Sequence, residues 1–107
     1  MNILVTGATR GIGKAIAVEL MAIGDVYATG RNLEALQKLG VKDFCPCDLR
    51  IEVEKLVDFI KTHEIDVLVN NAGEYIYGEI DKMTPVQRDS IFKTTLEAPT
   101  RLISAAV

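Results

Sequence analysis

The chain has 107 residues, of which 49% are hydrophobic and 25% charged, and its formal net charge is -3 at pH 7. This length and balance fit one globular domain. The sequence has no basic stripe for nucleic acid and no apolar stretch long enough to span a bilayer, so neither partner is expected. Met1 leads directly into an apolar run without a signal-peptide pattern, which makes the cytoplasm the expected location.

Short apolar runs alternate with segments of helical periodicity along the chain. The periodicity predicts strands at residues 3–5, 25–29, 42–47 and 66–69, helices at 11–23, 32–39, 51–63 and from Thr84 onward, and a loop at 74–83. In the first helix, one face should carry Ile12, Ile16, Leu20 and Ile23. Asn32 is the expected N-cap of the second helix, and Thr84 with Gln87 predicts a capping box at the start of the last one. This alternation predicts right-handed βαβ units and an α/β fold with a parallel sheet. In a strand order 3-2-1-4 the fourth strand would be an open edge. Such an edge favours pairing with further polypeptide or a second chain.

A glycine-rich turn joins the first predicted strand to the first predicted helix. Residues 6–13 read TGATRGIG, with glycines at positions 7, 11 and 13. A helix that begins in this way presents unpaired N–H groups, and its dipole attracts an anion such as phosphate. Glycine lets the backbone approach that anion and adopt positive φ. We interpret the turn as the binding site of a dinucleotide pyrophosphate; a merely tight turn is the alternative.

The spacing G-x-x-x-G-x-G of this turn resembles the cofactor loop of the short-chain dehydrogenase/reductases. A second segment, residues 66–73 (DVLVNNAG), resembles the strand-four signature of the same family, and residues 48–49 match its adenine-contacting position. The resemblance covers essentially the whole chain. It implies the front half of a Rossmann-type doubly wound sheet, with about four strands and flanking helices. Residues 1–107 would then form a cofactor-binding half-domain that stops before the family's catalytic Tyr-x-x-x-Lys segment.

The family resemblance also implies roles for individual residues. The Thr9 hydroxyl would face the adenosine, and Asp48 would accept a hydrogen bond from the adenine amino group; capping the following helix is the alternative role of Asp48. Residues 71–73 would line the nicotinamide ribose, whereas Asn70 would tie neighbouring strands together. The expected cofactor-binding residues are Gly7, Thr9, Arg10, Gly11, Ile12, Gly13, Arg31, Asn32, Asp48, Leu49, Asn71, Ala72 and Gly73.

The segment after the second predicted strand indicates which nicotinamide cofactor is bound. A site that prefers NAD places a carboxylate there to hold the ribose 2′-OH. Residues 29–32 read TGRN and contain no acid, whereas Arg31 offers a guanidinium that can grip a phosphate with two hydrogen bonds. Arg10 is a second cation from the other loop. We therefore predict NADP(H) rather than NAD(H); two solvated surface arginines are the alternative.

The catalytic groups that the resemblance implies are missing from the chain. Each of the three tyrosines is followed four residues later by a residue other than lysine. Thr95 stands where the family's helix-four Asn is expected, and Pro99 follows four residues later. Because proline has no N–H, the Thr95 carbonyl would lose its helical partner and the helix would kink. We hypothesise that the freed carbonyl holds a water; an ordinary proline kink is the alternative.

The sequence thus predicts the NADP(H)-binding portion of an enzyme that transfers hydride between nicotinamide and a carbonyl or alcohol carbon. The chain alone is expected to bind cofactor without turnover. A non-catalytic NADP(H)-sensing module or partner subunit is one alternative, and a truncated, self-associating fragment is another. A homo-oligomer or a completing chain is the expected partner, and a small-molecule substrate is expected only if the C-terminal half is supplied. No metal site is expected, since Cys45 and Cys47 lack enough companion ligands.

Overall fold

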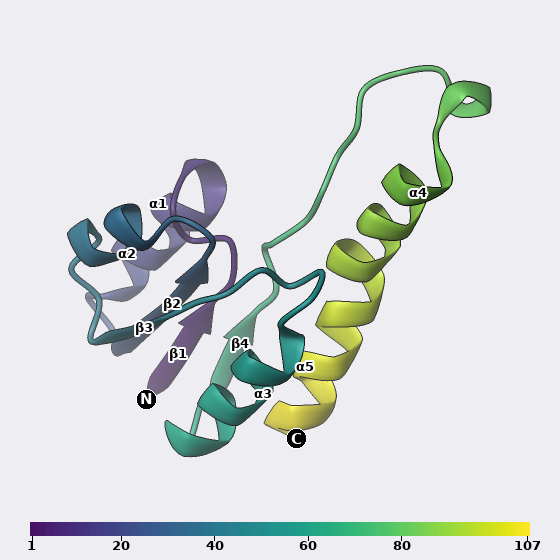
Figure 1. Ribbon diagram of the computed structural model, residues 1–107. Helices are drawn as coiled ribbons and strands as arrows, with labels where there is room; N and C mark the ends of the chain where they lie inside the picture. Colours follow the sequence, from purple (N-terminus) through teal and green to yellow (C-terminus); the bar gives the residue numbers. More distant parts are fainter.

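A computed structural model describes residues 1–107 as a four-stranded parallel sheet with helices on both faces (Figure 1). The strand order β3-β2-β1-β4 confirms the predicted topology. In register, Leu4 pairs with Tyr27 on one side and with Leu68 on the other. The strands are β1 (Asn2–Val5), β2 (Asp25–Gly30), β3 (Asp43–Pro46) and β4 (Val67–Val69).

Helices connect the strands in the alternating pattern that the sequence predicted. The capping box expected at Thr84 and Gln87 is present, with both reciprocal hydrogen bonds formed. The predicted loop 74–83 contains one short 3-10 turn, Ile80–Lys82. The α-helices are α1 (Gly11–Leu20), α2 (Leu33–Lys38), α3 (Val53–Thr62), α4 (Pro85–Phe92) and α5 (Ala98–Ala106).

The first helix is shorter than its apolar periodicity predicted. After Leu20 the N–H groups of residues 21–23 bond to carbonyls three residues back, so the helix tightens and ends. Ile23, placed by the periodicity on the buried face, is exposed, and Ile12 at the other end is 75% exposed. Only the middle of the predicted apolar face, Ile16 with Leu20, packs on the core.

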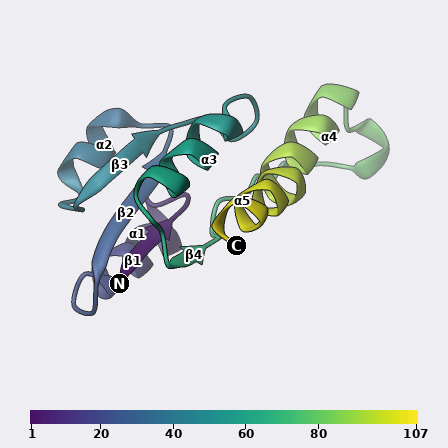
Figure 2. The ribbon, with the colours of Figure 1, turned by 90° about the horizontal axis from the view of Figure 1, so that it is seen from below.

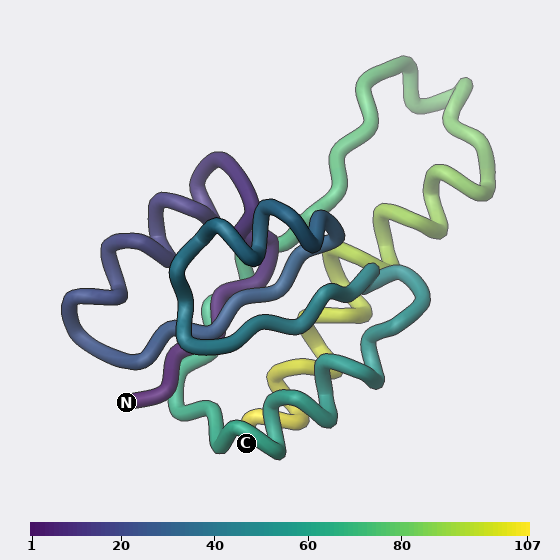
Figure 3. The backbone as a smooth tube through the Cα atoms, turned by 60° about the vertical axis from the view of Figure 1, so that its left-hand side comes forward, coloured from purple at the N-terminus to yellow at the C-terminus, as the bar shows by residue number.

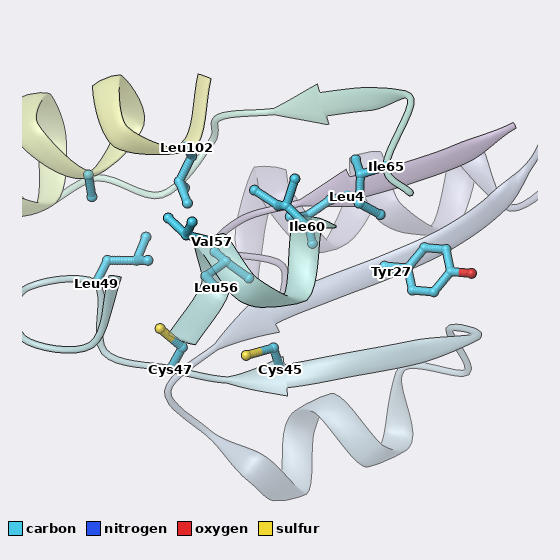
Figure 4. Packing of buried hydrophobic residues seen from close by; sticks show 11 residues of the cluster. Leu4, Tyr27, Cys45, Cys47, Leu49, Leu56, Val57, Ile60, Ile65 and Leu102 are labelled. Atoms are coloured by element: carbon cyan, nitrogen blue, oxygen red, sulfur yellow. The ribbon is translucent and has the colours of Figure 1, made fainter. Parts of the chain in front are cut away.

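Two hydrophobic clusters cover the two faces of the sheet. On one face, α1 and α2 bury Ala17 and Leu36 against alternate residues of β1 and β2. On the other, α3 and α5 pack Leu56 and Leu102 over Leu4 and its neighbours (Figure 4). Each central strand thus carries apolar side chains toward both layers, as parallel strands between helices require.

The cysteines belong to the second of these clusters. Cys45 and Cys47 are both buried and free, two residues apart, and both sulfurs point toward α3 in Figure 4. The hydrogen bond with Cys45, together with burial, raises the pKa of the Cys47 thiol. The same hydrogen bond lowers the pKa of the Cys45 thiol. By their burial in the apolar cluster, both side chains pack as small apolar groups.

The last helical segment runs through a π turn, Lys93–Glu97, that joins α4 to α5 in one continuous rod (Figure 2). Within it the Ala98 N–H reaches back five residues to the Lys93 carbonyl. Pro99, which lacks the N–H that an α-helix needs here, follows directly, and a wider turn accommodates such a gap. The expected kink is thus taken up as a π turn.

None of the helices combines the length and the apolar character that a membrane span requires.

The two termini lie at the same end of the molecule, beside the amino ends of the strands (Figure 3). The loop after β4 and helix α4 extend in the opposite direction, beyond the carboxyl ends of the strands (Figure 1). The molecule is accordingly elongated, with extents of 45 × 26 × 20 Å.

Candidate cofactor-binding site

A cleft of about 330 Å³ opens at the carboxyl ends of the strands. Ligands of open parallel sheets bind at this edge. Every expected cofactor-binding residue lines the cleft except Asn32, whose side chain instead accepts a hydrogen bond from the Ala35 N–H at the start of α2. The lining residues that were not expected are Thr29, Gly30, Cys47, Arg50, Glu74 and Thr94.

The glycine-rich turn forms the floor of the cleft. Gly7 and Gly11 have φ of 63° and 58°, in the left-handed region that favours glycine. A Cβ on Gly13 would lie 2.1 Å from the Gly7 carbonyl oxygen and 2.3 Å from the Asn71 amide nitrogen. Gly13 is therefore required for the close contact between the turn, α1 and the segment after β4.

The amino end of α1 is open to an anion. Arg10, at the N-cap position, makes no side-chain capping hydrogen bond, and the first turn contains no acidic residue. The N–H groups there lack a side-chain partner, and the helix dipole favours a negative charge. The exposed Ile12 lines the cleft directly beside them. This end of the cleft is built for a phosphate group.

Thr6 and Asn71 fasten the glycine-rich turn to the segment after β4. The buried Thr6 hydroxyl accepts from the N–H groups of Asn71 and Ala72 at 3.0 and 2.9 Å. The Asn71 amide nitrogen donates to the carbonyls of Thr6 and Gly7, both at 3.1 Å. The tie that the sequence assigned to Asn70 is therefore made by Asn71, and Asn70 is exposed.

Arg10 and Arg31 enter the cleft from two different loops. Both are exposed, and neither guanidinium forms an ion pair. Arg31 follows β2 directly, at the position where a carboxylate would hold a ribose 2′-OH. Two unpaired guanidinium groups that line one cleft favour an anionic ligand.

Asp48 lies at the turn after β3, where Arg50 binds its carboxylate. The Arg50 Nη2 donates to Oδ2 at 2.7 Å, and the Arg50 backbone N–H donates to Oδ1 at 3.0 Å. The guanidinium of Arg50 thereby holds the pKa of Asp48 below its usual range. Asp48 does not cap α3, since the residue at that N-cap is Glu52 and no side chain caps it.

The far end of the cleft carries a small polar cluster around Glu74. The Ser90 hydroxyl of α4 donates to the Glu74 carboxylate, and the Glu74 N–H donates to the Thr95 Oγ1 at 3.2 Å. Thr94 lines the cleft, and its hydroxyl oxygen is buried without a hydrogen-bond partner. Thr95 itself does not line the cleft but supports the backbone beside it.

These features fit a dinucleotide: a glycine turn at an open helix end for the pyrophosphate, arginines beside Asp48, and an amide-rich segment opposite. The sequence profile of the short chain dehydrogenase family matches residues 1–107. The chain belongs to this family. Arg50 and Glu74 follow two of the family segments directly, so their positions in the sequence were the signal that could have identified them.

Two relatives that are similar in sequence support the family assignment. An uncharacterised short-chain type dehydrogenase/reductase of Sinorhizobium fredii is 39% identical over 86% of this chain and 42% of its own length. The 7alpha-hydroxysteroid dehydrogenase of Escherichia coli is 40% identical over 65% of this chain and 32% of its own length. The chain thus spans less than half the length of either relative.

Solved structures share the fold. A short chain dehydrogenase of Burkholderia cenocepacia, in complex with NADP, matches with a TM-score of 0.86 and 29% identity. The match covers 97% of this chain and 48% of that one. The half-sheet with its flanking helices is therefore an arrangement found in a nicotinamide-dinucleotide-binding protein.

Proposed function

We propose that this chain is the NADP(H)-binding portion of a short-chain dehydrogenase/reductase. The observation that carries the proposal is one cleft that is lined by the glycine-rich turn at the open end of α1 and by Arg10 and Arg31. The NADP-bound Burkholderia cenocepacia structure supports the choice of cofactor. When bound, the cofactor supplies or accepts the hydride, while this chain binds and orients it.

Each part of the cleft has a distinct task in the proposal. The N–H groups at the start of α1 hold the pyrophosphate, and Arg10 with Arg31 holds the 2′-phosphate. Asp48 accepts from the adenine amino group, with Leu49 beside the ring. At the other end, residues 71–73 line the nicotinamide ribose. The Asn71 amide contributes mainly by fixing the glycine-rich turn, since its N–H bonds are already made to Thr6 and Gly7.

The proposal includes binding without turnover by these 107 residues. No Tyr-x-x-x-Lys pair occurs among them, so the groups that protonate the substrate oxygen would come from other polypeptide. The exposed apolar side chains of Phe92, Leu96 and Ile103 support assembly with such polypeptide or with a second copy. A cytoplasmic location is part of the same proposal.

Calorimetric titration of the full chain with NADPH and NADH tests the proposal. We expect NADPH to bind at least about tenfold more tightly, because charge-assisted hydrogen bonds to one phosphate have this magnitude. Arg31→Asp should remove that preference, whereas Arg88→Asp, an exposed arginine of α4 outside the cleft, should keep it. Binding of neither dinucleotide, or equal affinity for both, would contradict the proposal.

A non-catalytic NADP(H)-sensing subunit would show the same titration, and the missing Tyr-x-x-x-Lys pair is the feature in its favour. Supplying the C-terminal half of a close relative separates the two functions. Restored NADPH-dependent reduction of a carbonyl substrate would identify the enzyme portion, and unchanged binding without reduction would favour the sensor.

A further inference from the structure

The Asp48 carboxylate accepts all of its hydrogen bonds from one neighbouring residue, Arg50. A carboxylate offers about four lone-pair sites. Its Oδ1 accepts from the Arg50 backbone N–H at 3.0 Å and from Nε at 3.1 Å, and its Oδ2 accepts from Nη2 at 2.7 Å and from Nε at 3.3 Å. All of these contacts come from Arg50, whose single Nε–H is shared between the two oxygens. Three N–H groups of one residue therefore cover the carboxylate, and a further donor competes with them for its lone pairs.

The turn that carries the pair is fixed by its own backbone hydrogen bonds. The Asp48 carbonyl accepts from the N–H groups of Ile51 and Glu52 at 3.1 and 2.8 Å, and the Asp48 N–H donates to the Glu52 carboxylate at 3.0 Å. The Asp48 side chain is 17% exposed, compared with 39% for Arg50. The backbone therefore stays in place while the more exposed guanidinium is the part that can move.

A second carboxylate offers the displaced guanidinium a partner. Arg50 and Glu74 both line the cleft. The hydrogen bond to Asp48 is the main cause that raises the pKa of Arg50, and the charge of Glu74 adds to it. Arg50 thus lies within electrostatic reach of the Glu74 carboxylate, which accepts a hydrogen bond from Ser90.

We propose that Arg50 is a specificity-determining residue that occupies Asp48 in the free chain and competes with the amino group of the adenine base. The proposal rests on the proposed function, which places adenine beside Asp48. A 6-amino base competes with the guanidinium for the carboxylate lone pairs, whereas a 6-oxo base can accept a hydrogen bond from the guanidinium where it stands. Arg50 therefore lowers the discrimination between adenine and hypoxanthine dinucleotides.

A comparison of two ligands and two variants tests this competition. The full chain and Arg50→Gln are titrated with NADPH and with reduced nicotinamide hypoxanthine dinucleotide phosphate, which carries a 6-oxo base. We expect Arg50→Gln to raise the affinity ratio in favour of NADPH by about fivefold, the scale of one hydrogen bond. Arg88→Gln, which removes an equal charge outside the cleft, should leave the ratio unchanged.

The outcomes separate this inference from the proposed function. An unchanged or lowered ratio in Arg50→Gln, with NADPH still bound, would overturn only the competition. Failure of the wild-type chain to bind either dinucleotide would overturn both. The ratio of the two affinities is informative because a variant that merely damaged the structure would weaken the binding of both ligands alike.

The wild-type chain provides a measurement that does not depend on a variant. The Arg50 Nε–H, held between both carboxylate oxygens, should give a distinct ¹⁵N–¹H NMR signal in the free chain. Saturating NADPH should shift that signal more than the hypoxanthine analogue does. Equal shifts with the two ligands would overturn the proposal even if Arg50→Gln failed to fold.

Discussion

The region around the cleft and the helical rod 85–106 differ in how their side chains are used. Residues 1–72 pack both faces of the sheet and carry the ties between the glycine-rich turn and Asn71. In the rod, only Ala98 and Leu102 are buried, and α4 buries no residue at all. Phe92, in contrast, is 57% exposed. The cleft region thus holds nearly all of the buried core, although some of its apolar side chains are exposed, whereas most large apolar side chains of the rod stay exposed.

This difference indicates where the stability of the isolated chain resides. Burial of apolar area is the main source of stability, and nearly all of it lies in the first region. Helix α4 depends on local features, namely its capping box and its continuity with α5. Substitutions in the two regions should therefore lower the free energy of unfolding by different amounts. The following changes are ordered from the largest expected loss to the smallest.

Gly13→Ala should be the most damaging single change. The new Cβ would overlap the Gly7 carbonyl oxygen, which is backbone and cannot move aside cheaply. We expect a loss of about 3 kcal/mol in the free energy of unfolding, measured by urea denaturation. Gly40→Ala is the matched control, because that residue has φ of 83° and open space around it, and should cost only about 1 kcal/mol. Equal costs would mean that the close contact is not what matters.

Asn71→Ala should weaken the same region without adding bulk. It leaves the Thr6 and Gly7 carbonyls without the amide that now donates to both. We expect a loss of about 2 kcal/mol in the free energy of unfolding. Asn70→Ala, at the exposed neighbour, should cost less than about 0.5 kcal/mol. The reverse order would return the structural role to Asn70.

Thr84→Ala tests the rod through its cap. The change removes the acceptor of the Gln87 N–H and half of the capping box. We expect a cost of about 1 kcal/mol, seen mainly as faster amide hydrogen exchange in α4. The exchange rates in β1 and β2 should not change. Faster exchange there as well would show that the two regions unfold as one unit, contrary to the comparison drawn above.

The Asp48–Arg50 pair should have the smallest effect on stability, and the effect should depend on pH. The pKa of Asp48 is lower in the folded chain than its ordinary value of 3.8. The stabilisation is therefore complete above that ordinary pKa and is lost as the pH falls through the folded-state pKa. We expect Asp48→Asn to cost at most about 1 kcal/mol at pH 7, since Arg50 is partly exposed. The cost should shrink towards pH 2; a constant cost would exclude the ion pair as its source.

Much of the fold was predictable because its signals are local. The capping box at Thr84, the Asn32 cap and the glycine spacing each depend on a few consecutive residues, and the structure contains all three. The strand order followed from the alternation of strands and helices together with the family resemblance. The ends of helices were harder to predict, as Ile23 shows. Periodicity alone does not reveal where the backbone N–H groups begin to bond to the carbonyl three residues back instead of four.

The parts that were not predicted depend on contacts between distant segments. The choice of Asn71 over Asn70 is decided by which amide faces the Thr6 and Gly7 carbonyls, 64 or 65 positions away. Glu74 owes its place to Ser90 and Thr95 of the rod. Arg50 is close to Asp48 in sequence, yet its role depends on a turn conformation that the residue types alone did not indicate.

The position of both termini at the amino ends of the strands has a practical consequence for handling the molecule. A surface tether, an affinity tag or a fluorescent fusion joined to either terminus would stand on the side away from the cleft (Figure 3). Immobilised by one end, the chain would therefore present its cleft to the flowing solution.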